Sequence, residues 1–194
     1  TLFEIGKSLV AETDIDKLLP LAMDKVIAET EAQRGILTIL GADGELLFES
    51  ARNFDQKDIE RPEFEISKTV IDRVLESGKP AVIRNALDEP ELAGSGSIAR
   101  LKVLSVACAP LCSGEQVIGA IYIDNRDLTA VFSEETGRLL NEFAALISVA
   151  IQNALERRRL LEQQLELRTA LEHSQGYGEI IGNSPAMQEV FALI

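Results

Sequence analysis

The chain has 194 residues, 46% of them hydrophobic and 26% charged, which allows one domain of ordinary size with an extension or two small domains. Its 32 acidic and 19 basic residues give a net charge of -13, and a surface of this sign repels phosphate backbones, which argues against direct nucleic-acid binding. No apolar run approaches the roughly 20 residues that cross a bilayer, and the first residues lack the charged-then-apolar order of a signal peptide. We therefore expect a cytoplasmic protein with no membrane segment.

The first predicted element is an amphipathic helix that runs to about Thr30. Apolar residues recur at helical spacing from Ile15 onward. Thr13 and Asp16 resemble a capping box at the start of this helix. Pro20 falls inside it, so we expect the helix either to start near Asp16 or to kink.

The middle of the chain predicts a hairpin, a second helix and a short strand. Two apolar runs within residues 36–53 flank a Gly-Ala-Asp-Gly turn, which is typical of a hairpin. From Ser67 to Glu76 the apolar residues return to helical spacing, with Ser67 placed as the cap. Residues 80–83 then predict a strand. Residues 84–102 contain Pro90, Gly94 and Gly96, which argue against a long element, so we expect a loop with a short helix near its end.

The second hairpin is the strongest in the sequence. Residues 103–112 and 115–124 form two apolar runs that meet at a Ser-Gly turn. Beyond Ser133, which is placed as an N-cap, the sequence predicts one long helix. Five strands linked mostly by hairpins, with helices at both ends, predict an α+β fold. We expect an antiparallel β-sheet flanked by helices, with a long C-terminal helix.

Three parts are expected along the chain. A domain spans residues 1–154, a helical linker spans residues 155–175, and residues 176–194 begin a further folded unit. This last part opens with a Gly-rich break, after which Ser184 and Pro185 favour the start of a helix. The linker therefore leads from the first domain into a second one.

The order of these elements, together with three segments, resembles a GAF domain. The segments are SVACAPL at 105–111, VIGAIYIDN at 117–125 and VFSEET at 131–136. The tail EIIGNSPAMQEVFALI, residues 179–194, resembles the entry to the AAA+ ATPase domain of sigma-54-dependent transcriptional activators, where an I-G-x-S-x-x-M stretch precedes the nucleotide-binding loop. The resemblance implies a regulatory sensor for signal transduction and transcription regulation that controls the AAA+ ATPase.

Two alternatives remain open, a GAF sensor with another output and a free methionine sulfoxide reductase. The sequence contains no G-x-x-x-x-G-K-[ST] phosphate loop, so we predict that this segment is not an enzyme. The resemblance implies that the full-length protein is an ATPase, with this segment acting on its own downstream AAA+ domain.

Cyclic nucleotide binding is not expected. GAF domains that bind these ligands carry an N-K, F, D-E signature, which Asn125, Arg126 and Phe132 fill only in part. Thr136 and Gly137 stand where the acidic pair belongs, so the expected salt bridge has no acidic partner there. We interpret Phe132 as a plug in the core beneath the last helix.

The loop at 84–102 is where the resemblance implies that a small-molecule ligand would be enclosed. Polar groups that face such a pocket are typical of ligand sites, and an arginine there pairs well with a carboxylate or phosphate. The candidate ligand-binding residues are Arg84, Asn85, Ser97, Arg100 and Cys108. The sequence identifies neither the ligand nor any cofactor.

The two cysteines and the single histidine predict no metal site. Cys108 and Cys112 lie on one strand at a spacing that places them on the same side, and we expect them to pack as small apolar residues rather than sense redox state. A haem or bilin site needs a histidine in the pocket, whereas His173 lies in the linker. An iron site made by Cys108 and Asp88 has no supporting ligand spacing.

The C-terminal helix carries an apolar stripe with the spacing of a coiled coil. Arg158 and Arg168 interrupt the stripe, yet an exposed helix of this length is marginal in water without a partner. We therefore predict a homodimer through this helix, which would set the spacing between two ATPase domains. The residues of the predicted dimer helix are Ile147, Ile151, Ala154, Leu161 and Leu165.

Overall fold

The structure is a computed structural model that describes residues 2–41, 45–59, 67–86, 88–89, 103–129, 131–175 and 188. Contacts along the chain divide it into two compact units, Thr1–Leu155 and Glu156–Ile194. Each unit is described by itself below. The predicted short helix near the end of the 84–102 loop and the predicted start of a further unit at 176–194 fall almost entirely outside the described residues.

The first unit is built on one antiparallel sheet with the strand order β2-β1-β5-β4-β3. The strands are β1 (Arg34–Leu40), β2 (Leu46–Asn53), β3 (Ala81–Ile83), β4 (Ser105–Ser113) and β5 (Gln116–Asn125). The helices of the chain are α1 (Leu2–Ala11), α2 (Ile15–Thr30), α3 (Lys68–Ser77) and α6 (Glu134–Gln175). The predicted α+β fold with an antiparallel sheet, flanking helices and a long C-terminal helix is confirmed.

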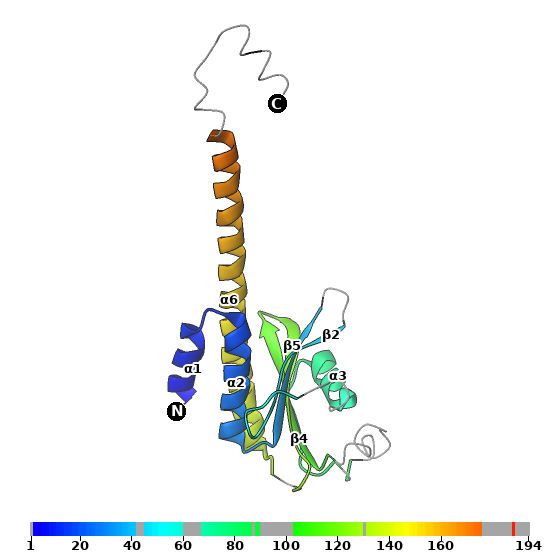
Figure 1. The fold of residues 1–194 in the computed structure, drawn as a ribbon. Coiled ribbons are helices and arrows are strands. Elements are labelled where there is room, and N and C mark those ends of the chain that lie inside the picture. The colour runs from blue at the N-terminus through cyan, green and yellow to red at the C-terminus, as the bar shows by residue number, and fades with distance from the viewer. Residues whose placement is uncertain are drawn as a thin grey trace. The chain divides into compact units, whose positions relative to one another are not determined.

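Helices cover both faces of this sheet. The helices α1, α2 and the first part of α6 lie on one face, and α3 lies on the other (Figure 1). A first core fills the space between the sheet and the three helices and includes Leu18, Met23, Ile121, Phe132, Phe143 and Ile147. A second core lies on the face that packs against α3, here called the α3 face, and includes Ile36, Ile71, Val74, Val106, Cys108 and Tyr122. Because both faces are covered, the central strands β4 and β5 are apolar along nearly their whole length.

The start of α2 differs from the sequence prediction. Asp14, not Thr13, is the N-cap, and its Oδ1 accepts a hydrogen bond from the Asp16 backbone N–H at 3.1 Å. Pro20 lies inside α2, which runs unbroken to Thr30. A proline there removes one backbone donor, and the buried face of the helix supplies the packing that holds it in place.

Both predicted hairpins are present. In the first, β1 pairs with β2, and in the second, β4 pairs with β5 around Gly114, whose φ of 61° suits a residue without a side chain. The strand β5 also lies against β1 so closely that a Cβ on Gly119 would strike the carbonyl oxygen of Thr38. Gly119 therefore allows the two hairpins to join into one sheet.

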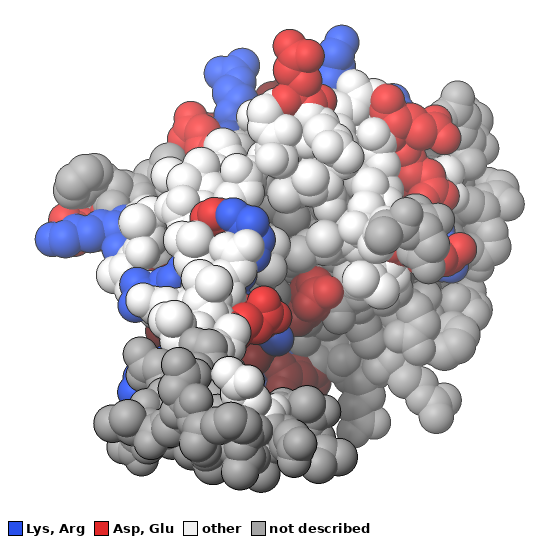
Figure 2. Space-filling view, turned by 90° about the horizontal axis from the view of Figure 1, so that it is seen from above, with Lys and Arg blue, Asp and Glu red and all other residues white. Residues whose placement is uncertain are grey.

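Charged side chains are scattered over the one face of the molecule that Figure 2 draws. On the face drawn in Figure 2, acidic and basic residues alternate with uncharged ones. No helix within the described ranges is long and apolar enough to cross a membrane.

Candidate functional site

Tyr122 lies at the centre of the α3 face. Residues 120, 122 and 124 of β5 alternate onto this face, and Tyr122 is fully buried there. Its hydroxyl makes no hydrogen bond of ordinary geometry to a described residue, although the Asp124 carboxylate and the Ser67 backbone lie close enough to affect its pKa. Burial, and then the charge of Asp124, raises the pKa of this hydroxyl, whereas Arg34 and the backbone of Ser67 act to lower it. Tyr122 is therefore a neutral hydroxyl with unused hydrogen-bonding capacity inside the domain.

Asp124 and Arg34 form a buried ion pair beside Tyr122. The Asp124 side chain is fully buried, and the Arg34 side chain is 12% exposed. Arg34 donates from Nε to Asp124 Oδ1 at 2.9 Å and from its terminal nitrogen to Oδ2, so the guanidinium grips both carboxylate oxygens. Burial raises the pKa of Asp124, and the charge of Arg34 opposes that effect.

Ser67 brings the start of α3 to the same face. It occupies the N-cap position, as predicted, but its side chain makes no capping hydrogen bond. The residue is fully buried, and its Oγ has no partner among the described residues. The first backbone N–H groups of a helix point along its axis beyond the N-terminus and favour an electron-rich oxygen there.

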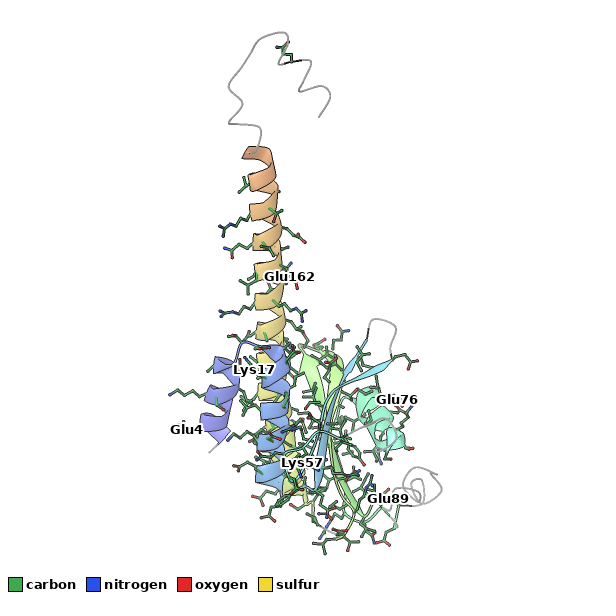
Figure 3. The ribbon with its side chains drawn as sticks, viewed as in Figure 1. Glu4, Lys17, Lys57, Glu76, Glu89 and Glu162 are labelled. Carbon is green, nitrogen blue, oxygen red and sulfur yellow. The ribbon has the colours of Figure 1, made fainter. Side chains whose placement is uncertain are left out.

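A surface pocket of about 560 Å³ lies near the end of β3. It is lined by Val82, Arg84, Asn85, Asp88, Glu89, Thr129 and Glu134. Asn85 donates from Nδ2 to Asp88 Oδ2 at 2.8 Å. Glu89 lies beyond α3 at the lower end of the sheet (Figure 3). Among the described residues, the lining combines one guanidinium with three carboxylates, a charge balance that does not suit an anion.

The predicted ligand-binding residues do not form a single cluster. Arg84 and Asn85 line the surface pocket, whereas Cys108 is fully buried on the α3 face, opposite Tyr122 in the strand pairing. Ser97 and Arg100 lie outside the described residues. Sequence reasoning missed Tyr122 as a candidate site residue. The available signal was the charged Asp124 two residues further along an otherwise apolar strand, which places both side chains on the same face.

The two cysteines differ in their surroundings. Burial raises the pKa of the Cys108 thiol far above its ordinary range, so Cys108 stays protonated and is a poor nucleophile or metal ligand. Cys112 is partly exposed, and the pairing register shifts between Leu111 and Cys112. That shift interrupts the strand alternation on which the same-side prediction depended. Asp88, the other candidate iron ligand, lines the surface pocket rather than the core.

The positions of the cyclic-nucleotide signature support the fold instead. Asn125 accepts hydrogen bonds at Oδ1 from the backbone N–H groups of Asp127 and Leu128, at 3.0 and 2.9 Å. Phe132 is fully buried in the first core, so its interpretation as a plug is confirmed. Thr136 donates its backbone N–H to the Ser133 hydroxyl at 3.3 Å, which caps the start of α6.

The dimer prediction needs a correction for its first three residues. Ile147, Ile151 and Ala154 are buried in the first core of their own domain, so they are not available to a second helix. Helical periodicity revealed an apolar stripe, but the domain covers its first half. Leu161 and Leu165, in the second unit, are 56% and 67% exposed.

The second unit consists, where described, of α6 from Glu156 onward and Gln188. Side chains extend from this helix in all directions around Glu162 (Figure 3). A groove along it is lined by Leu161, Gln164, Leu165, Leu167, Arg168 and Leu171. Ion pairs within the helix join Arg158 to Glu162 at 3.3 Å and Arg159 to Glu156 at 2.8 Å. The side chain of His173 is not among those described.

Sequence comparisons relate the chain to one domain family and to one group of regulators. The GAF domain model matches residues 14–151. The chain is 26% identical to the Nif-specific regulatory protein of Herbaspirillum seropedicae, covering 100% of this chain and 37% of that protein. It is 24% identical to the nitrogen fixation protein AnfA of Azotobacter vinelandii, covering 100% of this chain and 38% of that protein. The chain therefore spans well under half the length of these relatives.

Solved structures share the fold. The free methionine-R-sulfoxide reductase of Neisseria meningitidis, in complex with its substrate, superposes with a TM-score of 0.64 at 18% identity over 80% of this chain and 89% of that one. The GAF domain of an Acinetobacter phosphoenolpyruvate-protein phosphotransferase gives 0.62 at 15% identity over 80% of this chain and 92% of that one. At such identities the likeness concerns the fold alone.

Proposed function

The chain belongs to the GAF domain family, and on this premise we propose that it is the regulatory sensor of a sigma-54-dependent transcriptional activator. The relatives that match the whole chain are named as regulators of nitrogen fixation, and the chain covers 37% and 38% of their lengths. The resemblance of residues 179–194 to the entry of an AAA+ domain supports an ATPase as the output. The sensor, the linker at 155–175 and this ATPase would act together in the cytoplasm.

The α3 face is the input surface in this proposal. Its main support is the pair of fully buried hydroxyl groups, Tyr122 and Ser67, that make no hydrogen bond of ordinary geometry to a described residue. A buried polar group without a hydrogen bond costs about 1–3 kcal/mol, so a ligand that supplies the missing bonds gains that energy on binding. We propose a small molecule that presents hydrogen-bonding oxygen or nitrogen atoms to these hydroxyls within an otherwise apolar surround.

Native mass spectrometry of the purified chain tests this input surface. We expect a small molecule to be retained, and both Tyr122→Phe and Ser67→Ala to release it. Ser77→Ala, at the other end of α3, is the matched control, because Ser77 is exposed and its hydroxyl bonds to the nearby backbone of Lys79. The proposal would be contradicted if the purified chain carries no ligand and if a cellular small-molecule extract does not raise its melting temperature.

The output is proposed to be a homodimer that forms through the linker part of α6. The support is the exposed pair Leu161 and Leu165, one helical turn apart on one side of α6, with three further exposed leucines, Leu160, Leu167 and Leu171, on the neighbouring side. Arg and Glu side chains pair with one another along the helix, so little net charge opposes the approach of a second copy. A dimer would bury this apolar face and bring two ATPase domains to a fixed spacing.

Sedimentation of the intact chain tests the dimer. We expect a dimer at micromolar concentration that Leu161→Glu plus Leu165→Glu weakens without unfolding the domain. Gln163→Glu plus Ala170→Glu adds the same charge to exposed positions on the side of the helix away from Leu161 and Leu165, and it should leave the dimer intact. A monomeric chain, or equal weakening by both pairs, would contradict this arrangement.

A further inference from the structure

The strand β4 is joined to α6 through the backbone of Cys112. Leu111 pairs with Gly119, but Cys112 pairs with Val117 rather than the next residue in register, which marks a bulge. At this bulge the Cys112 backbone N–H donates to the Ser148 hydroxyl at 3.0 Å. The Cys112 carbonyl accepts from Gln152 Nε2 at 3.2 Å. The backbone N–H and the backbone carbonyl of Cys112 are thus both held by side chains of α6.

The two side chains that hold Cys112 lie one helical turn apart. Ser148 is 2% exposed and donates its own hydroxyl proton to the Ala144 carbonyl at 2.7 Å, which fixes the hydroxyl oxygen as an acceptor toward Cys112. Gln152 then reaches the carbonyl of the same residue. We call Ser148, Gln152 and the Cys112 backbone the clasp.

The clasp adds something that the apolar contacts of α6 lack. Ile147 and Ile151 bury α6 against the sheet, but apolar burial has no direction and tolerates small sliding of a helix. Hydrogen bonds weaken steeply with misalignment, so two of them on one residue fix where α6 lies along its axis. A displacement of the β4–β5 hairpin at Cys112 must therefore either move α6 or break the clasp.

The same strand also reaches the α3 face. Cys108 lies four residues before Cys112 on β4. It is fully buried in the second core and pairs with Tyr122 on β5. We propose that the clasp carries displacements of β4 on the α3 face into α6, so that Ser148 and Gln152 are positioning residues for the output helix. The proposal rests on the proposed function for its choice of the α3 face as the input surface. Its test uses no ligand, so the clasp and the proposed ligand site can each fail separately.

Amide hydrogen exchange followed by NMR tests the clasp directly. In Ser148→Ala plus Gln152→Ala, the Cys112 amide should exchange about fivefold faster than in the wild type, the ratio expected for loss of one ordinary hydrogen bond. Asn153→Ala is the matched control, because Asn153 is exposed on the same helical turn. Ser148→Ala alone removes the acceptor of the Cys112 N–H while it keeps Gln152, and it serves as a second variant if the double variant does not fold. An unchanged Cys112 amide in these variants would overturn the proposal.

Transmission is tested by a small change on the α3 face. Cys108→Ala, which opens a small space beside Tyr122, should alter the amide exchange of α6 between Ala144 and Leu155 when the clasp is intact. The same substitution should leave α6 unchanged in the clasp variant, while still altering β5 in both backgrounds. An equal response of α6 in both backgrounds would overturn the proposal, and so would the absence of any α6 response in the wild-type background.

Discussion

Arg34→Met removes the cation from the buried pair with Asp124 while it preserves most of the aliphatic volume of the side chain. Asp124 is then fully buried with its main neutralising partner gone, because Arg34 grips both of its oxygens. The cheapest relief is protonation of Asp124. At pH 7 this costs about 4 kcal/mol for a carboxyl whose pKa in the unfolded chain is about 3.9. That value agrees with the loss of about 3–5 kcal/mol typical of breaking a buried pair.

The pH dependence distinguishes this cause from lost packing. Burial already raises the pKa of Asp124 in the folded protein, and removal of Arg34 removes the effect that opposes it. A folded-state pKa above the unfolded value means that the folded chain binds the extra proton, so the variant gains stability as pH falls. The deficit relative to the wild type should shrink as the pH falls from 7 to 5, by up to about 1.4 kcal/mol per pH unit where Asp124 is ionised in the wild type and protonated in the variant.

Urea unfolding followed by circular dichroism at several pH values measures both quantities. At pH 7 the melting temperature should also fall by roughly 6 to 20 °C, given the size of the chain. Arg34→Met plus Asp124→Leu, which replaces the pair with apolar groups, should recover most of the loss. A deficit below about 1 kcal/mol at pH 7, or one that does not change with pH, would refute the reasoning.

Three further predictions concern thiols, strand contact and nucleotides. At pH 8 a thiol reagent should label Cys112 in the native chain and Cys108 only as fast as the chain unfolds, because burial raises the pKa of the Cys108 thiol; two equally fast thiols would contradict this. Gly119→Ala should destabilise the chain by about 3 kcal/mol or more in urea titrations, because the added Cβ meets the Thr38 backbone. Gly114→Ala, in an open turn with a φ of 61°, should cost about 1 kcal/mol, and equal losses from the two substitutions would contradict the strand contact. Calorimetry with cyclic AMP or cyclic GMP should show no binding tighter than about 100 micromolar, and micromolar binding would overturn our interpretation of Thr136 and Gly137.

Local signals in the sequence predicted most of the fold. The hairpins follow from paired apolar runs around Gly-containing turns, and α3 follows from helical spacing between Ser67 and Gly78. The helix α1 was not predicted, although Thr1 and Glu4 have the spacing of a capping box at its start. The N-cap of α2 was placed one residue early, since Thr13 and Asp14 are both good caps and only the backbone geometry separates them.

The candidate site was harder to predict than the fold. Periodicity shows that Ile147 and Ile151 are apolar on one side, but it does not show whether a second copy or the same domain covers them. Tyr122 lies on a strand buried on both faces, where the usual contrast between a polar and an apolar side disappears. The bulge at Cys112 depends on pairing between two strands, which no single stretch of sequence encodes.

The most direct test of the central claim, that this chain is the regulatory domain of an ATPase, is the ATP hydrolysis rate of the full-length protein with and without residues 1–154. Both proteins should be compared at equal concentration, with the linker at 155–175 retained. We predict that removal of the domain changes the rate several-fold, and that Tyr122→Phe or the clasp variant shifts the intact protein toward the rate of the shortened one. Identical rates for the full-length and shortened proteins, with and without a cellular small-molecule extract, would contradict the account.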